Sequence, residues 1–460
     1  MDLAASVFPT NNWGDRKIDG AVHEAWRPIH YLGSKLRALP ALDQAILNVA
    51  PRGEPICDLF AGSGTVSAWF AESRPVTAVD IQEYSRVICE ALLNPAHFSV
   101  STVIDEIAYD LQRAEQMGVI FAGKPLIQFE VDAMAQAQVG DLCALASLIE
   151  AGSMMTFQSG PKLDGLTIAF DACRSRLSNL SVPTVGSMAL RHFGGVYFSY
   201  QQAAELDVIL DYAHSSPSIH RSTLMAAALS TASELVNTVG KHFAQPLRPR
   251  NKDGTIKNSL YRQVSRDRYK STLDIFQETL ARYVSLKDFG FENRSIQSDY
   301  VEFLGSSKFD ASVVYADPPY TRDHYSRFYH VLETLALRDD PEISTNTAHG
   351  KTALSRGIYR QGRHQSPFCI RSEAPAAFDE LFRLVSAKGV PLVLSYSPYA
   401  SEMNAHPRVM TMEGITELAQ RHFKRVDISS VGTFHHSRLN KSDLNKEISY
   451  EAEYLLVCEI

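Results

Sequence analysis

The sequence has few cysteines, and none of them are closely spaced. Six occur in 460 residues, and no Cys-x-x-Cys pair is present. This spacing indicates neither a zinc site nor a disulfide framework. We therefore expect no metal, and a reducing, cytoplasmic environment. The cysteines are Cys57, Cys89, Cys143, Cys173, Cys369 and Cys458.

Long apolar runs are also absent. No run reaches the roughly 18 residues that a membrane-spanning helix needs. Residues 1–5 lack the basic segment followed by an apolar one that marks a signal peptide. We therefore expect no membrane association and no signal peptide. Hydrophobic residues still make up 45% of the chain, which is ample for a core, and 460 residues can hold two domains.

The chain has no overall excess of positive charge. Its formal net charge is −7, which does not suit a nucleic-acid-binding protein as a whole. Two segments differ from the rest. Residues 246–270 carry eight basic and two acidic side chains, with Tyr261 and Tyr269 among them, and residues 351–371 carry five basic residues and no acid. Taken alone, such runs are most often solvated surface.

The most informative feature that is present is Asp317-Pro318-Pro319-Tyr320. It follows an apolar, β-branched run at residues 312–316, which predicts a buried strand ended by two prolines. A carboxylate, a carbonyl and an aromatic ring at the end of a strand suit an amino group attached to a flat ring. Asp317 and the Pro318 carbonyl can accept its two N–H protons, and Tyr320 can stack on the ring. The alternative is a surface turn after a strand.

A second pattern predicts a site for a nucleoside. A short apolar strand runs into a turn that contains Phe60, Gly62 and Gly64, and a helix pattern follows. Glycine permits positive φ and close approach of a ligand, and a helix N-terminus offers free N–H groups. Residues 75–80 predict a second strand that ends in Asp80, whose carboxylate suits a ribose diol. The alternative is a structural glycine turn in another doubly wound enzyme.

Together these motifs resemble the S-adenosylmethionine-dependent DNA adenine-N6 methyltransferases of the Dam-like (alpha) group. Tyr31-Leu32-Gly33-Ser34-Lys35 resembles the N-terminal Tyr-x-Gly-Ser-Lys motif of that group, and Asp299-Tyr300 resembles its adenine-binding pair. The order of the motifs, with a long insertion before the adenine-binding pair, is that of the alpha group. The resemblance covers residues 29–94 and 293–460, and it covers 95–292 only by position.

The resemblance implies an enzyme that flips an adenine out of double-stranded DNA and transfers a methyl group from S-adenosylmethionine to its N6 atom. Positioning and electrostatics would then carry the rate, with no metal and no covalent intermediate. In this scheme Asp80 meets the ribose and Asp58 the methionine ammonium. The implied catalytic residues are Asp317, Pro318, Pro319 and Tyr320. The implied cofactor-binding residues are Tyr31, Lys35, Asp58, Phe60, Gly62, Gly64, Asp80, Asp299, Tyr300 and Asp317.

Beside these motifs, we interpret the two basic segments as phosphate-contacting. The residues assigned to nucleic-acid binding are Arg248, Arg250, Lys252, Arg262, Arg266, Arg268, Arg360 and Arg363.

Several other residues have two interpretations. Tyr325 and Arg327 follow the catalytic motif and could line the DNA side, whereas Tyr329 could equally be core. Ser395 and Tyr396, at the end of a predicted strand, could contact the base or pack in the core. Four residues near the C-terminus could reach the target base or belong to a solvated hairpin: His435, His436, Asn440 and Lys441.

The expected fold is α/β. It combines a Rossmann-like methyltransferase sheet, mostly parallel with one antiparallel strand, with a largely helical inserted target-recognition domain. The strand number and the reversed strand come from the resemblance. The expected domains are an irregular N-terminal lead-in at 1–28, a catalytic domain at 29–98 and 293–460, and the insertion at 99–292.

Periodicity adds local predictions. Helices are expected over 99–117 and through most of 125–245, with the strongest pattern at 220–243, and Pro246 to Pro249 mark a break. Another helix is expected to cover 328–335, and residues 338–370 are expected to form a long loop. Strands are predicted to resume near 293, at 390–397, and in a closing antiparallel pair at 424–433 and 451–460.

Other functions would fit parts of this pattern. An RNA adenine-N6 methyltransferase shares every catalytic feature, although the large insertion favours duplex DNA. A protein-glutamine methyltransferase usually has Asn in place of Asp317. A DNA-binding scaffold on a degenerate methyltransferase fold would not need the acidic residues of the motifs. Their presence argues against this alternative: Asp58, Asp80, Asp299 and Asp317. The chain has no Pro-Cys dipeptide, which argues against a cytosine-C5 methyltransferase. We expect a role in restriction–modification or phage defence, with a possible partner protein.

Overall fold

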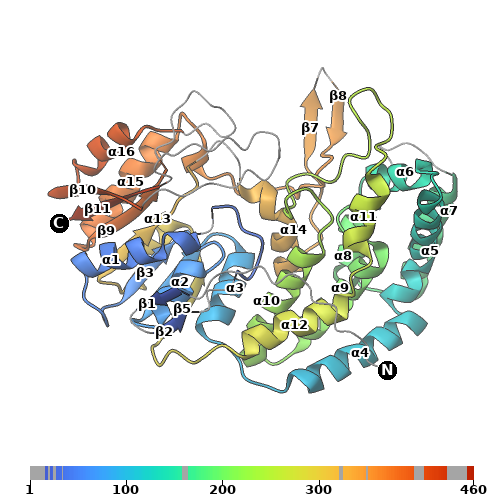
Figure 1. Cartoon of the computed structure of the whole chain (residues 1–460), viewed down its shortest axis with the longest axis horizontal. Coiled ribbons are helices and arrows are strands. Elements are labelled where there is room, and N and C mark those ends of the chain that lie inside the picture. Colours follow the sequence, from blue (N-terminus) through green and yellow to red (C-terminus); the bar gives the residue numbers. More distant parts are fainter. Residues whose placement is uncertain are drawn as a thin grey trace.

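The centre of the fold is a seven-stranded sheet in the order β10-β11-β9-β6-β3-β4-β5 (Figure 1). This computed structural model describes residues 16–18, 21–23, 27–33, 35–157, 164–320, 325–348, 351–397, 409–431 and 453–460. β11 runs antiparallel to both neighbours and all other pairings are parallel, which confirms the predicted sheet. The strands are β3 (Ile56–Leu59), β4 (Val76–Asp80), β5 (Arg294–Gln297), β6 (Val313–Ala316), β9 (Leu392–Tyr396), β10 (Arg425–Ser430) and β11 (Tyr454–Glu459).

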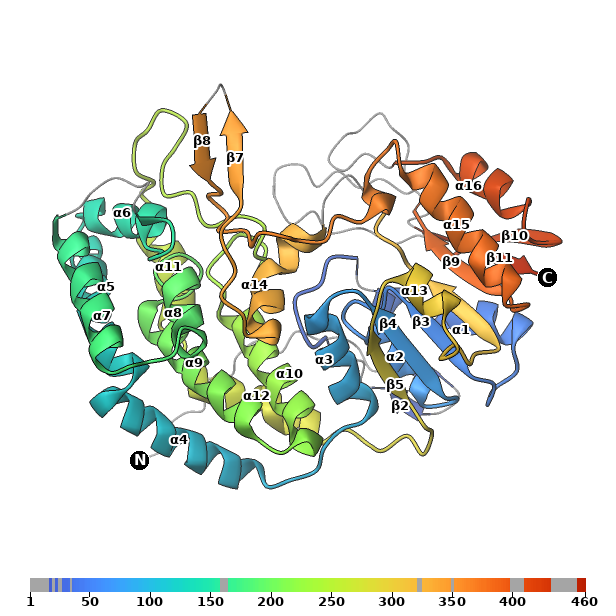
Figure 2. The ribbon, with the colours of Figure 1, turned by 180° about the vertical axis from the view of Figure 1, so that it is seen from behind.

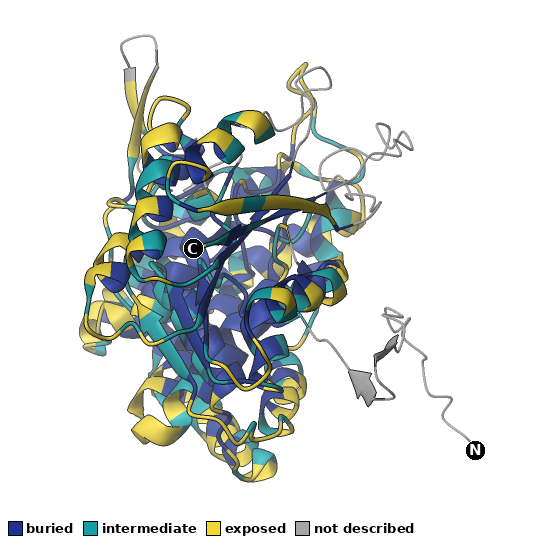
Figure 3. Cartoon of the chain, turned by 90° about the vertical axis from the view of Figure 1, so that its left-hand side faces the viewer, coloured by how far each residue is buried: buried dark blue, intermediate teal, exposed yellow. Residues whose placement is uncertain are grey.

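Helices cover both faces of this sheet. Successive side chains of a strand point to opposite faces, so a strand covered on both sides is buried at every position. β3 and β6 show this pattern, and Figure 3 shows the buried strands between more exposed helices. One face packs against α1 (Leu39–Val49) and α2 (Thr65–Ala71). The other packs against α13 (Tyr300–Gly305), α15 (Ala374–Ala387) and α16 (Met412–Ala419).

The strand register brings the motifs to one edge. Leu59 lies opposite Val79 in β4 and opposite Ala316 in β6, so these three parallel strands end together. In a sheet of this kind, ligands bind outside the carboxyl ends of the strands. The antiparallel β11 contributes its beginning to the same edge, because Tyr454 pairs with Tyr396 at the end of β9.

The chain between β4 and β5 is helical. After α3 (Glu83–Leu93) come α4 (Val100–Met117), α5 (Val119–Gln138), α6 (Cys143–Ala151), α7 (Asp164–Asn179), α8 (Met188–Phe193), α9 (Tyr200–Ser215), α10 (Ser218–Leu235), α11 (Leu260–Arg268) and α12 (Thr272–Val284). The predicted helices are therefore present. No helix within the described ranges is both long enough and apolar enough to span the width of a membrane.

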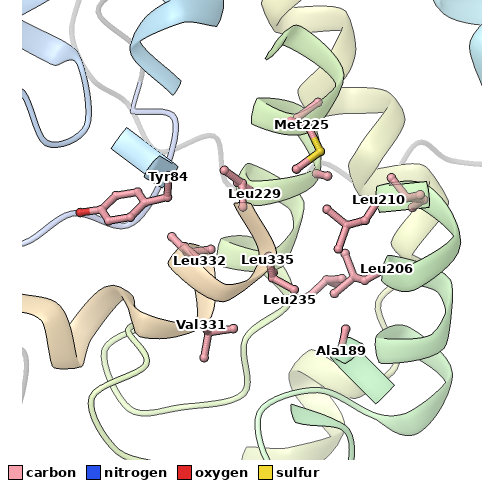
Figure 4. Close-up of a cluster of buried hydrophobic side chains, with 14 of the residues drawn as sticks. Tyr84, Ala189, Leu206, Leu210, Met225, Leu229, Leu235, Val331, Leu332 and Leu335 are labelled. Atoms are coloured by element: carbon pink, nitrogen blue, oxygen red, sulfur yellow. The ribbon is translucent and has the colours of Figure 1, made fainter. Parts of the chain in front are cut away.

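α10 joins this helical part to the sheet. From Thr223 onward its side chains are buried on nearly all sides, as expected for a helix in the middle of a core. It packs against α3, α9, α12 and α14 (Tyr325–Leu337). Figure 4 shows Leu229 of α10 near Leu332 of α14 and Tyr84 of α3. The helices therefore share a core with the part of the chain that contains the sheet, and α14, which follows the Asp-Pro-Pro-Tyr motif, is packed between the two.

Three local predictions were wrong. Residues 338–370 are not all loop, because β7 (Thr345–Ala348) and β8 (Lys351–Leu354) form an antiparallel hairpin. The described part of 1–28 contains a second hairpin, β1 (Arg16–Ile18) with β2 (Ala21–His23). β7 could not be predicted from the sequence, because residues 345–347 are exposed and show no alternation of apolar and polar side chains. The helix expected at 220–243 ends at Leu235.

Candidate active site

A cavity lies at the carboxyl edge of the sheet, where β3, β4 and β6 end. Most of the predicted site residues line it, together with several that the sequence did not indicate. The lining includes Tyr31, Lys35, Phe60, Asp80, Asp299, Tyr300, Asp317, Pro318, Pro319, Tyr320, Tyr325, Ser326, His364, Ser366 and Phe368. Three predicted residues do not line it: Asp58, Gly62 and Gly64.

Asp80 presents a fixed carboxylate to the cavity. One carboxylate oxygen accepts the Gly62 N–H at 2.9 Å, and the other accepts the Gln82 N–H, also at 2.9 Å. Gly62 has φ of +56°, and a Cβ there would overlap the Tyr31 ring. Burial raises the pKa of Asp80, and the backbone hydrogen bonds oppose that shift. The glycine therefore serves two purposes, since it permits the turn and makes room for Tyr31.

Asp58 and Gly64 have structural partners instead. Asp58 is buried, and its carboxylate accepts the Ser67 hydroxyl at 2.5 Å. Burial raises the pKa of Asp58 to about 7. Gly64 has φ of +73° at the start of α2, and a Cβ there would overlap Leu92 and crowd Cys89 of α3. These two residues hold α2 and α3 against the sheet, so the structure does not bring them to the cavity.

Three aromatic rings form the far wall of the cavity. The Tyr300 ring lies 5.6 Å from Phe60 and 5.3 Å from Phe368, and Phe60 and Phe368 are 5.4 Å apart. Phe60 adopts φ of +63°, a costly conformation for a bulky residue. Asp299 caps α13 by accepting the Val301 N–H at 2.8 Å, and it lines the cavity beside these rings. An apolar aromatic wall with an acidic residue beside it suits one face of a purine.

At the opposite end, Lys35 bridges two carboxylates. Its ammonium lies 2.9 Å from Asp317 and 2.5 Å from Glu453, and only 6% of the side chain is exposed. Burial raises the pKa of Asp317 to about 6, and Lys35 opposes the shift. Burial alone would lower the pKa of Lys35, but the two carboxylates raise it well above its usual value. Lys35 therefore stays charged and fixes the Asp317 carboxylate.

Tyr320 completes this end. It is buried at 8% exposure, packs against Tyr396 at 5.0 Å, and lies 5.6 Å from the Lys35 ammonium. Ser395 bonds to the Tyr315 hydroxyl at 2.9 Å, and the Tyr396 hydroxyl donates to Met410 O at 2.8 Å. Tyr396 therefore supports Tyr320 from behind, in keeping with its interpretation as core packing.

The N-terminal motif is anchored on α14. The Tyr31 ring stacks on Tyr329 at 4.9 Å, and the Tyr329 hydroxyl accepts the Leu32 N–H at 2.7 Å. Tyr329 is buried, so it is a core residue that positions Tyr31. Glu333, one turn further along α14, accepts the N–H groups of Glu83 and Tyr84 and caps α3 directly after Asp80. Burial raises the pKa of Glu333 to about 7.

Glu453, Phe368 and His364 are functional candidates that sequence reasoning missed. Glu453 precedes β11, and its place at the carboxyl edge follows once β11 is known to run antiparallel. That signal was available in the predicted closing strand pair. Phe368 and His364 lie in the segment predicted to be a loop, and no spacing indicated their approach to Tyr300 and Asp80.

The two basic segments lie side by side. Arg356 donates to Leu247 O at 2.8 Å, and the Tyr197 hydroxyl lies within hydrogen-bond distance of both Phe243 O and Gly357 O, at 2.8 and 2.9 Å. In Figures 1 and 2 the chain before α11 stands beside the β7–β8 hairpin. Five of the predicted nucleic-acid-binding residues in this region are exposed: Arg248, Arg250, Lys252, Arg262 and Arg266.

The prediction that Arg268 binds nucleic acid was wrong. Its side chain is 2% exposed, forms an ion pair with Glu130, and donates to Gly195 O at 2.7 Å. A buried, paired arginine is not available to a phosphate. Arg360 is also engaged, by Asp339 at 2.6 Å and by the Thr334 hydroxyl at 3.3 Å. The predicted residues His435, His436, Asn440 and Lys441 lie outside the described part of the chain.

Comparison with known proteins gives a consistent result. The family described as D12 class N6 adenine-specific DNA methyltransferase matches residues 31–119 and 258–366. These two stretches contain the N-terminal motif, the glycine turn, Asp80, the Asp299-Tyr300 pair and the Asp-Pro-Pro-Tyr motif. The unmatched stretch between them contains most of the inserted helices.

Three curated relatives are modification enzymes. Modification methylase LlaI of Lactococcus lactis subsp. lactis is 25% identical over 402 residues, which is 86% of this chain and 51% of that protein. Type II methyltransferase M.NlaIII of Neisseria lactamica is 24% identical over 366 residues, 77% of this chain and 80% of that protein. Type II methyltransferase M.FokI of Planomicrobium okeanokoites is 34% identical over 107 residues, 23% of this chain and 14% of that protein. The chain thus spans about half the length of the LlaI enzyme.

Proposed function

We propose that this chain, which belongs to the D12 class of N6-adenine-specific DNA methyltransferases, methylates N6 of an adenine flipped out of double-stranded DNA, with S-adenosylmethionine as methyl donor. The observation that carries the proposal is the cavity itself. It joins an acid-and-aromatic pocket at one end to Asp317-Pro318-Pro319-Tyr320 at the other, so a nucleoside and an amino group could be bound side by side.

The cavity residues fit the proposed methyl donor. The Asp80 carboxylate, fixed by two backbone N–H groups, would accept both hydroxyls of a ribose. The aromatic wall formed by Phe60, Tyr300 and Phe368 would pack against the adenine, with Asp299 at its edge. When bound, S-adenosylmethionine supplies a methyl group that its sulfonium already activates. Asp58 does not line the cavity, so we leave it out of the proposed contacts.

Asp317 and Pro318 would prepare the target amino group. The exocyclic nitrogen of adenine is a poor nucleophile because its lone pair is delocalised into the ring. Hydrogen bonds from its two protons to the Asp317 carboxylate and the Pro318 carbonyl favour a pyramidal nitrogen with a free lone pair. Tyr320 would stack on the extruded base. Positioning of this kind can supply several kcal/mol of the barrier reduction, ~7 or more in the best cases.

Lys35 and Glu453 would act as positioning residues. Lys35 holds the Asp317 carboxylate at 2.9 Å and keeps it aimed at the cavity, while Glu453 holds Lys35 from the other side. The methylated nitrogen must lose one proton. The Asp317 carboxylate, with its pKa raised toward neutrality, is placed to accept it.

We further propose that residues 99–292 form the target-recognition region and that the exposed basic residues contact DNA phosphates. The residues that remain in this proposal are Arg248, Arg250, Lys252, Arg262, Arg266 and Arg363. Arg268 is excluded from it by its burial, and Arg360 because its side chain is only 13% exposed and is paired with Asp339. Arg250 and Arg266 also pair with acids, but their side chains are 40% and 64% exposed. The relatives' names include modification and type II methyltransferases, which supports a restriction–modification role for this chain.

Nucleoside mass spectrometry would test the proposal. Genomic DNA and total RNA would be analysed from cells that express this chain or its Asp317→Ala variant, in a host without adenine methylation. We expect N6-methyladenine in the DNA of the wild-type strain alone. A signal confined to RNA would favour an RNA methyltransferase. Absence of any signal would contradict the proposed activity, and binding of labelled S-adenosylmethionine would then identify a binding-only protein.

A further inference from the structure

Two arginines share one aromatic ring near the active-site cavity. The guanidinium carbon of Arg363 lies 4.7 Å from the centre of the Tyr359 ring, and that of Arg327 lies 5.9 Å from it. Arg327 belongs to the first turn of α14, whereas Arg363 lies beyond β8. The fold therefore brings two like charges from separate segments onto a single surface, which costs energy unless an anion joins them.

The ring that carries them is fixed in place. The Tyr359 hydroxyl donates a hydrogen bond to Ala244 O. The His330 ring meets Tyr359 edge-on, with centroids 5.1 Å apart and planes at 90°. His330 itself is buried and bonds to Phe243 O through its Nε2 atom at 3.2 Å. Tyr359 is thus a platform anchored on both the helical part and α14.

Among the described residues, no carboxylate forms an ion pair with Arg363. Its Nε and Nη1 atoms are buried without a hydrogen-bond partner within the described residues. Arg360, only three residues earlier, shows the contrast, because it forms an ion pair with Asp339 and bonds to Thr334. Burial lowers the pKa of Arg363, and Arg327 adds to that effect. A desolvated guanidinium beside a second one is an arrangement suited to an anionic oxygen.

The pair stands at the edge of the cavity. Ser326, which lines the cavity, immediately precedes Arg327, and His364, which also lines it, immediately follows Arg363. A base that enters the cavity carries its own phosphodiester groups to the rim. The planar fork of arginine suits phosphate oxygens, and a phosphate contact fixes the register of the strand without reading its sequence.

We propose that Arg327 and Arg363, stacked on Tyr359, clamp one DNA phosphate beside the flipped nucleotide. The inference rests on the proposed function, and it assigns these two arginines a task distinct from that of the surrounding basic surface. The clamp would hold the extruded nucleotide in the cavity. It would therefore stabilise the complex in which the base is flipped out, whereas the surrounding basic residues would only attract DNA to the surface.

The test uses the full chain and three variants. Arg327→Gln and Arg363→Gln are combined in one variant. Arg363→Lys keeps the positive charge but removes the planar guanidinium, and Arg421→Gln is the control. Arg421 is exposed, lies outside residues 99–292, and follows α16, which lies away from the β7–β8 hairpin (Figures 1 and 2). We expect the double variant to raise the KM for DNA about tenfold or more and to reduce the slope of log affinity against log salt by about 1. Arg363→Lys should have a smaller effect, and the control none.

Replacing single DNA phosphates by uncharged methylphosphonates shows which phosphate the two arginines bind. A synthetic duplex that carries the recognition site, read by sequencing methylated DNA, would receive one methylphosphonate at a time around the target adenine. In the wild type, one linkage next to that adenine should raise KM about tenfold, and in the double variant the same linkage should add nothing. An equal further loss in the double variant would overturn the clamp. Unchanged binding of S-adenosylmethionine to the double variant would confirm that it is folded.

The two proposals can fail separately. If the wild type methylates the unmodified duplex but no single linkage distinguishes it from the double variant, the clamp is wrong and the proposed function stands. If the wild type methylates no DNA, the proposed function is wrong, and the clamp, which depends on it, is overturned as well.

Discussion

The carboxyl edge of the sheet and the basic segments use charged residues in opposite ways. At the sheet edge, strand register fixes where Asp80 and Asp317 emerge, and backbone N–H groups or Lys35 then orient each carboxylate. In the basic segments, neighbours in the sequence have different environments. Arg266 of α11 is exposed, while Arg268, two residues later, is buried against Glu130. A motif at the end of a strand therefore predicts where its side chains lie in the fold. A run of basic residues on a helix does not predict which of them are exposed, because successive side chains point to different sides of the helix.

The largest effect should come from Asp317, at the edge of the sheet. Asp317→Ala removes the acceptor for an amino proton and leaves Lys35 without one of its partners. We expect the methylation rate to fall by roughly 10²–10⁴-fold, the range for loss of a positioned acid–base group. Binding of S-adenosylmethionine, measured by calorimetry, should change little. A variant that kept more than a few per cent of the activity would contradict the role given to Asp317.

Two arginines of α11 test the contrast between exposed and buried members of one basic segment. Arg268→Ala leaves the buried Glu130 carboxylate without its charge partner, and breaking such a pair costs about 3–5 kcal/mol of folding free energy. Arg262→Ala, at an exposed position on the same helix, should leave thermal stability unchanged and weaken DNA binding in a salt-dependent way. Denaturant unfolding and DNA titration would separate the two. If Arg268→Ala were stable and defective only in DNA binding, the structural role of Arg268 would be wrong.

The two acids near the glycine turn offer a third test. Asp80→Ala removes the acceptor proposed for the ribose and should raise the Kd of S-adenosylmethionine by about 10- to 100-fold, the loss expected for hydrogen bonds to a charged group. Asp58→Asn should change the Kd much less, because burial already raises the pKa of Asp58 to about 7 and its partner is Ser67. Comparable losses for both variants would place Asp58 in the cofactor site after all.

The pH dependence should be the mildest effect. Burial raises the pKa of Asp317 to about 6, and the proposed mechanism needs its carboxylate form. Because protonation removes that form, kcat/KM should be constant above about pH 7 and fall as pH decreases through 6, by about tenfold per unit at the low end. The residual activity of Asp317→Asn should lack this step. A wild-type profile that stayed flat between pH 5 and 7 would contradict the assignment.

Much of the catalytic side could be predicted because its signals are local. A buried strand, a glycine turn and an acid in fixed order determine where Phe60, Asp80 and Asp317 lie, and the parallel sheet gathers them. Lys35 was also found, because its motif is contiguous. Glu453 was not, because it belongs to no motif, and its place beside Lys35 follows only from the antiparallel direction of β11 in the predicted closing strand pair.

The remaining errors have physical causes. The β7 strand was missed because its exposed residues carry no apolar face. Asp58 and Gly64 were assigned to the ligand, yet they serve the packing of α2 and α3, since a motif does not tell a ligand contact from a packing contact. Phe368 was missed because it reaches Tyr300 by way of an irregular segment.

The most direct test of the central claim is an assay with the purified chain, methyl-deuterated S-adenosylmethionine and unmethylated duplex DNA. After digestion, mass spectrometry would locate the label. The account predicts N6-deuteromethyl-deoxyadenosine as the labelled nucleoside, formed by the wild type and not by Asp317→Ala. Label on another base, or equal label with the Asp317→Ala variant, would contradict the claim that the Asp-Pro-Pro-Tyr edge of the sheet is an adenine-N6 methylation site.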